Sequence, residues 1–269
     1  MAELLRFDRV EISYDEYPAV RDVNMTLHEG EILAIVGESG SGKSTLIRAA
    51  MGLLGTSGKV AGGDIRYKGK SLLDLPEEER RRINGPEIGM IFQDSGSSFC
   101  PVRTIGSQLY ESMTSHQAVT KKDFENTASD LLQKLGFEDG KRILKSYPFE
   151  LSGGMQQRAG IAAAMLLKPA VLLADEPTSA LDVFAQKQVV EEMLLLRRMF
   201  GTSIILVTHN IGVAGAMADN VLVLKDGRVA EYGETQKVFS APQSAYTKKL
   251  MAAVPRLRLS GSHHDMEYT

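Results

Sequence analysis

Apolar residues recur along this 269-residue chain in two patterns, short uninterrupted runs and longer stretches with helical spacing. The runs are EILAIV at 31–36, IGMIF at 88–92, VLLAD at 171–175 and IILVTHN at 204–210. Runs of this length, bounded by glycine or polar residues, are typical of strands buried on both faces, as in a parallel sheet. Between 161 and 235 such strands alternate with helical stretches. We therefore expect an α/β core.

Three other regions show different patterns. Residues 1–30 and 58–70 alternate apolar and polar positions between turn signals, which predicts an antiparallel sheet beside the core. From 94 to 160 the leucines follow helical spacing, as in TKKDFENTASDLLQKLGF, so this part is expected to be helical. Residues 236–269 end in the polar segment GSHHDMEYT. We expect a flexible tail there.

The segment GESGSGKS at 37–44 follows the first apolar run and fits the pattern G-x-x-x-x-G-K-[ST]. Its glycines allow close approaches that a side chain would block, so successive N–H groups can turn inward around phosphate oxygens. Lys43 supplies a positive charge toward the β- and γ-phosphates, and Ser44 offers a hydroxyl to Mg²⁺. The helical spacing of STLIRAAMGLL places a helix N-terminus at the phosphates. A glycine-rich turn without a ligand is the disfavoured alternative, because strand, loop and helix follow in order.

Two carboxylates end the apolar run at 171–175. A buried central strand delivers Asp175 to its C-terminal edge, where ligands bind in open α/β sheets. Asp175 is the expected carboxylate on the magnesium side. Glu176 should project toward the γ-phosphate, where it can orient and deprotonate the attacking water as a general base. An acidic turn after a strand is the alternative interpretation.

The stretch LSGGMQQR at 151–158 lies between these two motifs. In this order the three motifs resemble the nucleotide-binding subunit of an ABC transporter, from about Leu5 to Leu257. The resemblance implies an α/β P-loop NTPase fold, the ABC cassette, with a RecA-like α/β core, an antiparallel β subdomain and a helical subdomain. It implies a nucleotide-binding core with the N-terminal β subdomain at 1–93 and 161–235, a helical subdomain with the signature at 94–160, and a C-terminal extension at 236–269.

The resemblance also implies roles for individual residues. Glu176, His209 and Gln93 are expected to be catalytic, as general base, switch histidine and Q-loop amide. The residues expected to contact ATP are Tyr14, Gly37, Ser39, Gly40, Gly42, Lys43, Ser44, Thr45, Ser152, Gly153, Gly154 and Asp182. Mg²⁺ is expected at Ser44, Gln93 and Asp175. Tyr14, which lies 29 residues before Lys43, is the expected aromatic that stacks on adenine, with Tyr17 as the alternative.

The signature motif points to a partner. Ser152 and Gly154 precede a helix, so the hydroxyl, the backbone N–H groups and the positive end of the helix dipole can address a γ-phosphate. In the family they close over ATP held by a second cassette, with Asp182 at the interface. The expected partners are a related but different ABC ATPase chain, two transmembrane permease subunits and, indirectly, an extracytoplasmic substrate-binding protein.

Composition and charge exclude several other classes of protein. The net charge is −3 and the basic residues are scattered, except for Arg80 to Arg82 after the acidic segment 76–79, so no basic field for nucleic acid is present. We interpret that charged run as a solvated helix with ion-paired faces. The single cysteine excludes a disulfide framework and a cysteine cluster. The longest apolar stretch, 161–167, is far below the roughly 20 residues of a membrane span. Any membrane role must therefore come through other subunits, and the resemblance implies a peripheral subunit at the cytoplasmic face of the bacterial inner membrane.

Two segments resemble the peptide, nickel and metallophore importer branch of the family: KRILKSYPFELSGGM at 141–155 and YTKKLMAAVPRL at 246–257. The segment QDSGSSFCP after Gln93 departs from that branch, with Cys100 where asparagine is usual. The expected function is the ATP-hydrolysing subunit of an importer for di- or oligopeptides, or for nickel or metal-chelate complexes. A soluble ABC ATPase of repair or translation is the alternative, disfavoured because the chain has neither a paired cassette nor a long coiled-coil insertion.

Overall fold

The computed structural model describes residues 2–93, 98–179 and 181–253. Its larger sheet has the strand order β10-β9-β3-β8-β7-β6. These strands are β3 Ile32–Val36, β6 Ile88–Ile91, β7 Val171–Asp175, β8 Ser203–Thr208, β9 Asn220–Lys225 and β10 Arg228–Glu234. Neighbours from β6 to β9 pair in parallel and β10 pairs antiparallel with β9. The four apolar runs are therefore confirmed as parallel strands, and their C-terminal ends meet at one edge of the sheet.

The second sheet is antiparallel, with the order β2-β1-β4-β5. It consists of β1 Glu3–Tyr14, β2 Tyr17–His28, β4 Gly58–Tyr67 and β5 Lys70–Ser71, which confirms the alternating pattern of residues 1–30 and 58–70. Helix α1 Lys43–Met51 packs between the two sheets, where Leu46 and Ile47 are fully buried. Burying these side chains anchors the first turn of α1 just after the glycine-rich loop.

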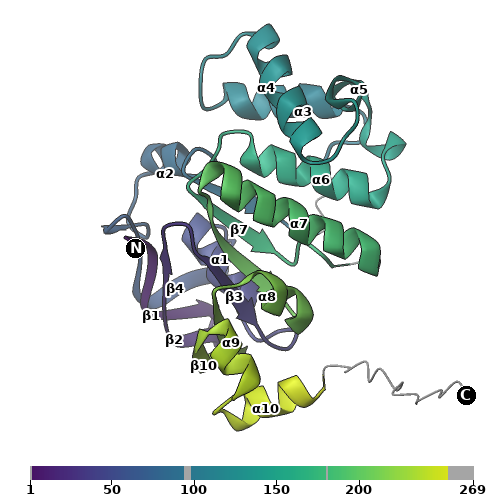
Figure 1. The fold of residues 1–269 in the computed structure, drawn as a ribbon. Coiled ribbons are helices and arrows are strands. Elements are labelled where there is room, and N and C mark those ends of the chain that lie inside the picture. Colours follow the sequence, from purple (N-terminus) through teal and green to yellow (C-terminus); the bar gives the residue numbers. More distant parts are fainter. Residues whose placement is uncertain (1, 94–97, 180, 254–269) are drawn as a thin grey trace, which may run out of the picture.

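The helices α3 Ile105–Thr114, α4 Lys121–Lys134 and α5 Gly140–Lys145 lie apart from both sheets, at the top of Figure 1. The short helix η1 Pro148–Glu150 then leads into α6 Gly153–Met165, and α7 Val183–Phe200 packs beside α6. One apolar cluster joins α3, α4, α5, α6 and α7 to β7 and β8. The expected helical character of 94–160 is confirmed for the described residues, and α6 continues five residues beyond it.

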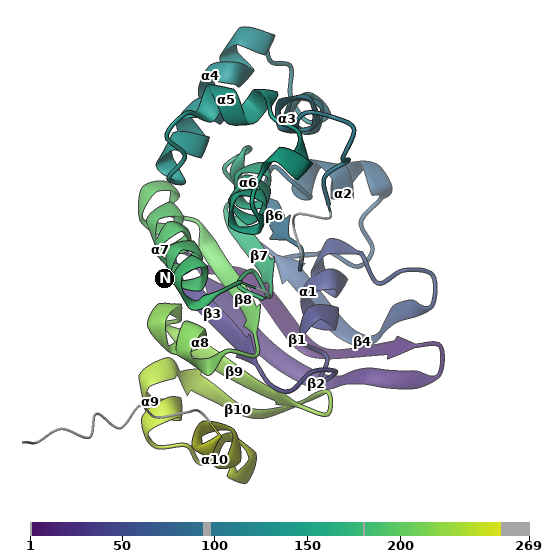
Figure 2. The same ribbon diagram turned by 90° about the vertical axis from the view of Figure 1, so that its right-hand side faces the viewer.

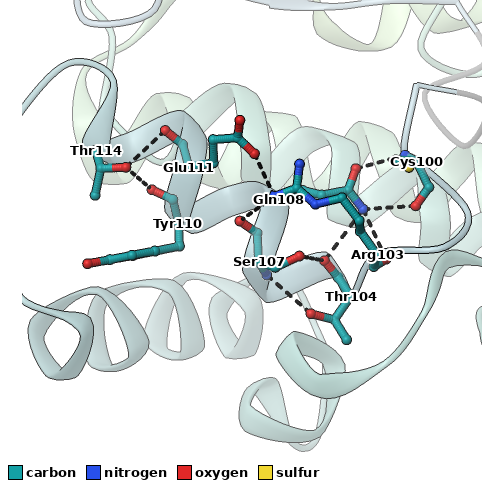
Figure 3. A network of polar contacts seen from close by, with 8 residues as sticks. All are labelled: Cys100, Arg103, Thr104, Ser107, Gln108, Tyr110, Glu111 and Thr114. Atoms are coloured by element: carbon teal, nitrogen blue, oxygen red, sulfur yellow. Dashed lines mark hydrogen bonds and ion pairs between the residues drawn. The ribbon is translucent and has the colours of Figure 1, made fainter.

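A polar network joins the segment before α3 to the first turns of α3, as Figure 3 shows. The side-chain oxygen of Gln108 accepts from the Cys100 N–H at 2.7 Å, and its amide nitrogen donates to the carbonyls of Cys100 and Arg103 at 3.1 Å each. Thr104 caps α3 by accepting from the Ser107 N–H at 3.3 Å. The residues that enter α3 are therefore held by α3 itself.

The charged helix α2 Glu77–Ile83 differs in part from expectation. Arg82 pairs with Glu78 at 2.8 Å on an exposed face, as the charge pattern predicts. Arg80 instead donates to the carbonyl of Leu72 at 3.1 Å and packs over Gly52, where a Cβ would lie 2.1 Å from its guanidinium. Arg80 therefore attaches α2 to the body of the protein rather than forming a surface ion pair.

The chain continues from β8 through α8 Ile211–Met217 to the hairpin of β9 and β10, and then to α9 Thr235–Ser240 and α10 Ala245–Ala252. Both views place α9 and α10 beside β10, at the end of the molecule opposite α3, α4 and α5 (Figures 1 and 2). Within the described residues, none of the helices has the length and apolar character needed to cross a bilayer. The expected tail from 254 onward lies outside the described residues.

Candidate active site

The glycine-rich segment forms a loop between the end of β3 and the start of α1, which we call the phosphate loop (residues 37–44). A Cβ at Gly37 would lie 2.2 Å from the Leu224 carbonyl oxygen, so only glycine lets the loop pass β9. Gly42 has φ 100°, and a Cβ there would lie 2.8 Å from the Ala19 carbonyl oxygen. Two of the three glycines are thus required by close backbone contacts.

Lys43 is almost fully buried, with 4% of its surface exposed, at the start of α1. Its Nζ donates to the carbonyl oxygens of Gly37 at 2.9 Å and Glu38 at 2.7 Å. Burial lowers the pKa of Lys43, and the negative charges of Glu176 and Asp175 act in the opposite direction. The amine is therefore held against the phosphate loop, with two carboxylates nearby.

Ser44 and Asp175 meet across the C-terminal edge of the sheet. Ser44 Oγ donates to Asp175 Oδ1 at 2.6 Å. Asp175 is fully buried at the end of β7, and its second oxygen lies 3.3 Å from the guanidinium of Arg48. Arg48 is a site residue that the sequence did not suggest, although its position five residues after Lys43 places it on the same helix. It compensates the charge of a buried carboxylate.

Glu176 follows Asp175 in an unusual backbone conformation, with φ 48°. Its N–H donates to the Val207 carbonyl at 2.9 Å, which joins the turn after β7 to β8. Its Oε2 lies 3.1 Å from Nδ1 of His209, the residue that follows β8. The two adjacent parallel strands thus bring a carboxylate and an imidazole together, and this pair can position and deprotonate a water molecule.

Lys43, Ser44, Glu176 and His209 meet at one cavity of about 500 Å³, whereas the expected site residues Gly37 and Asp175 are not among its lining residues. It is lined by Ala19, Ser39, Gly40, Gly42, Lys43, Ser44, Thr45, Gln93, Glu176 and His209. Nine of these ten residues belong to the expected site. Ala19 is the exception, and it was not found because only the folding of β2 over the phosphate loop brings it there.

The two candidate aromatics lie outside the lining of this cavity. Tyr14 ends β1 and packs beside Gly58, where a Cβ would lie 2.8 Å from Tyr14 Cε1. Tyr17 begins β2 and is 80% exposed. The Tyr14 ring therefore packs against the neighbouring strand β4, whereas the Tyr17 side chain is largely exposed.

The signature residues and Asp182 are also outside the cavity. Ser152 caps α6 and accepts from the Met155 N–H at 3.3 Å. A Cβ on Gly153 or Gly154 would meet nothing within 4 Å, so this helix start faces open space. Asp182 caps α7 and accepts from the Ala185 N–H at 2.8 Å. The starts of α6 and α7 that these residues form therefore lie outside the cavity at the phosphate loop.

Helix α6 is nevertheless connected to the turn that carries Glu176. Gln157 is buried in α6, and its side-chain amide donates to the Pro177 carbonyl at 2.8 Å, one residue after Glu176. Sequence reasoning did not single out Gln157, although it lies within the signature stretch. This contact couples the position of α6 to the turn that carries Glu176.

A protein-family model of the ABC transporter matches residues 20–179. The oligopeptide transport ATP-binding protein OppD of Salmonella typhimurium is 43% identical over 244 residues, which are 91% of this chain and 72% of OppD. The chain belongs to the ABC transporter family. It is thus an ATP-binding protein with ATPase activity, and the expected family and fold class are confirmed.

Two further similarities support this cassette assignment. The metal-staphylopine import system ATP-binding protein CntD of Staphylococcus aureus is 37% identical over 263 residues. The aligned part is 94% of this chain and 95% of CntD. Among solved structures, a dimeric post-hydrolysis state of the ATP-binding cassette MJ0796 bound to ADP and phosphate is similar, with a TM-score of 0.75 and 28% identity over 86% of this chain and 99% of that cassette. The similarity therefore extends through nearly the whole described fold.

Proposed function

We propose that this cassette hydrolyses ATP in the cavity at the phosphate loop and thereby powers an importer for di- or oligopeptides, or for nickel or other metal-chelate complexes. Relatives support the peptide and metal-chelate classes, since OppD is an oligopeptide transport protein and CntD serves a metal-staphylopine import system, whereas nickel rests on the resemblance of the sequence segments alone. The assembly would contain a second ABC ATPase chain and two transmembrane permease subunits, with an extracytoplasmic binding protein acting through them. The cassette would lie at the cytoplasmic face of the bacterial inner membrane.

One observation carries the mechanistic part of this proposal. Lys43, Glu176 and His209 line one cavity, whereas Ser152 caps a helix that opens onto a different surface. If hydrolysis needs both the cavity residues and a signature serine, a second cassette must supply that serine. The signature serine of the second cassette would then cover the ATP held by this one. The dimeric state of MJ0796 with ADP and phosphate supports such an arrangement. The proposed site is therefore shared between two chains.

The oxygen ligands at the edge of the sheet fit Mg²⁺. A serine hydroxyl and a carboxylate, Ser44 and Asp175, lie 2.6 Å apart, and Gln93 lines the same cavity. Mg²⁺ prefers oxygen ligands and is commonly held by one or two protein groups together with substrate phosphates. When bound it would neutralise charge on the β- and γ-phosphates. The hydrogen bond from Ser44 to Asp175 places both groups at the same point.

The roles of the other side chains follow from their positions. Lys43 can leave its two carbonyl acceptors and place its charge on the terminal phosphates. Glu176 can accept the proton of the attacking water, and His209 Nδ1 at 3.1 Å holds the Glu176 carboxylate in place. The positive φ of Glu176 points its side chain toward the cavity rather than along the strand direction. Tyr14, supported by Gly58, is the proposed adenine contact.

The subdomain division belongs to the same proposal. Residues 1–93 and 161–235 would bind nucleotide, and 94–160 would carry closure of the cassettes to the permeases through α6 and its contact with Pro177. Residues 236–269 would form the C-terminal extension. The position of α3, α4 and α5 apart from both sheets in Figure 1 supports this proposed division.

The test is reconstitution with the chains encoded beside this one. The cassette should co-purify with two hydrophobic subunits, and its rate of phosphate release should rise when a binding protein loaded with a peptide or metal chelate is added. A cassette that purifies without membrane subunits and hydrolyses ATP at full rate would exclude the importer and favour a soluble ABC ATPase.

A further inference from the structure

The C-terminal helix α10 reaches the phosphate loop through one side chain. The backbone N–H of Glu38 donates to the hydroxyl oxygen of Tyr246 at 3.2 Å, between residues 208 positions apart. Figures 1 and 2 show α10 beside α9 and β10, away from the helices that carry the signature. The contact therefore joins the nucleotide site to a helix that the catalytic groups do not use.

Glu38 is held on both sides. Its N–H is bonded to Tyr246, and its carbonyl accepts from Lys43 Nζ at 2.7 Å. Glu38 itself does not line the cavity, whereas the next two residues, Ser39 and Gly40, do. Tyr246 therefore holds Glu38, which directly precedes the cavity-lining residues Ser39 and Gly40. The same residue, Glu38, also binds Lys43, the expected ATP-contacting lysine.

Tyr246 has a defined position of its own. Its ring packs against the apolar cluster that contains Val36, the last residue of β3, and Lys225 Nζ lies 5.1 Å from the ring centroid. Ser244 caps α10 by accepting from the Tyr246 N–H at 3.3 Å. The Glu231 carboxylate of β10 accepts from the N–H of Ser244 at 3.1 Å. The hydroxyl is thus presented to Glu38 by a rigid support.

We propose that Tyr246 is a positioning residue for the phosphate loop, and that docking of α10 and binding of ATP favour each other. A glycine-rich loop loses much backbone freedom when it wraps around phosphates. A hydrogen bond that already restrains one end of the loop reduces that loss and strengthens binding by preorganisation. Because coupling between two sites is reciprocal, bound ATP must stabilise the docked α10 to the same extent. This inference rests on the proposed ATP site at the phosphate loop.

The test replaces Tyr246 by phenylalanine, which keeps the ring and removes the acceptor. Tyr232→Phe is the matched control, because Tyr232 also lies near the C-terminus and its hydroxyl donates to the Thr26 carbonyl at 3.2 Å, away from the loop. In titrations of the full chain, Tyr246→Phe should bind MgATP about two- to tenfold more weakly, the range expected for one hydrogen bond. In the assembled complex it should raise KM for ATP by a similar factor and leave kcat nearly unchanged. Tyr232→Phe should match wild type.

Hydrogen exchange gives a readout that a general loss of stability would not produce. MgATP should slow amide exchange in residues 245–252 of wild type and of Tyr232→Phe, and should leave that segment unchanged in Tyr246→Phe. Equal affinities of Tyr246→Phe and wild type, or equal weakening in both phenylalanine variants, would overturn the inference. Lys43→Ala distinguishes failure of the Tyr246 proposal from failure of the proposed ATP site. If Lys43→Ala loses ATP binding and Tyr246→Phe does not, only the role of Tyr246 is rejected. Undiminished binding in Lys43→Ala would reject the ATP site itself.

Discussion

We expect Glu192 to make the stability of this cassette depend on pH. It lies on α7, is only 6% exposed, and neither carboxylate oxygen has a hydrogen-bond partner within the described residues. Arg158 of α6 approaches to 3.8 Å but donates instead to the Leu135 and Gly136 carbonyls at 3.3 Å. Burial raises the pKa of Glu192 to about 8, against the opposing charge of Arg158. We therefore expect this carboxyl group to be protonated in the folded protein at neutral pH.

The sign and size of the effect follow from linkage. In the unfolded chain the group titrates near its ordinary pKa of 4.5, and in the folded chain near about 8. Between these values the folded state binds one more proton, so stability falls as pH rises, by about 1.4 kcal/mol per pH unit. The contribution is complete below the unfolded pKa and is lost as pH passes the folded pKa.

Glu192→Gln keeps the size of the side chain and cannot titrate. The free energy of unfolding of wild type minus that of Glu192→Gln should therefore decrease by about 1.4 kcal/mol between pH 6 and pH 7. Urea unfolding at each pH measures this difference, in which the contributions of all other groups cancel. Glu191→Gln is the matched control, because Glu191 is 64% exposed beside Lys187. A flat difference for Glu192→Gln, or an equal slope for Glu191→Gln, would refute the assignment of a buried neutral carboxyl group.

Three further predictions address the ATPase cycle. Glu176→Gln should keep ATP binding and lower turnover by roughly 10²- to 10⁴-fold, because the amide cannot accept the proton, and near-normal phosphate release in the assembled complex would exclude Glu176 as the base. Lys43→Ala should weaken nucleotide binding to the isolated chain while Ser152→Arg should not, and equal losses in a nucleotide titration would argue against a shared site. The rate per cassette should rise with concentration and with partner subunits, because a lone cassette lacks part of the transition-state contacts. A high rate that is independent of concentration would indicate a self-contained monomer.

The pattern of apolar, polar and glycine positions along the chain predicted most strands and the phosphate loop correctly. The four apolar runs became β3, β6, β7 and β8, and the alternating segments became the antiparallel sheet. The glycine positions of the phosphate loop followed from the need for close backbone contacts, as at Gly37. The charged helix α2 was less well predicted, because the carbonyl acceptors of Arg80 come from residues whose position the charge pattern does not encode.

The sequence by itself determined the family and the types of strand and helix, and it predicted the catalytic groups, because periodicity and motif spacing are local properties of the chain. The tertiary structure decided which distant groups meet. Arg48 reaches Asp175 across 127 positions, and Tyr246 reaches Glu38 across 208. It also placed Glu192 without a hydrogen-bond partner among the described residues, and Ser152 at a helix start outside the cavity of the phosphate loop. These features depend on how sheets and helices pack, and packing brings together residues whose separation along the chain carries no periodic signal.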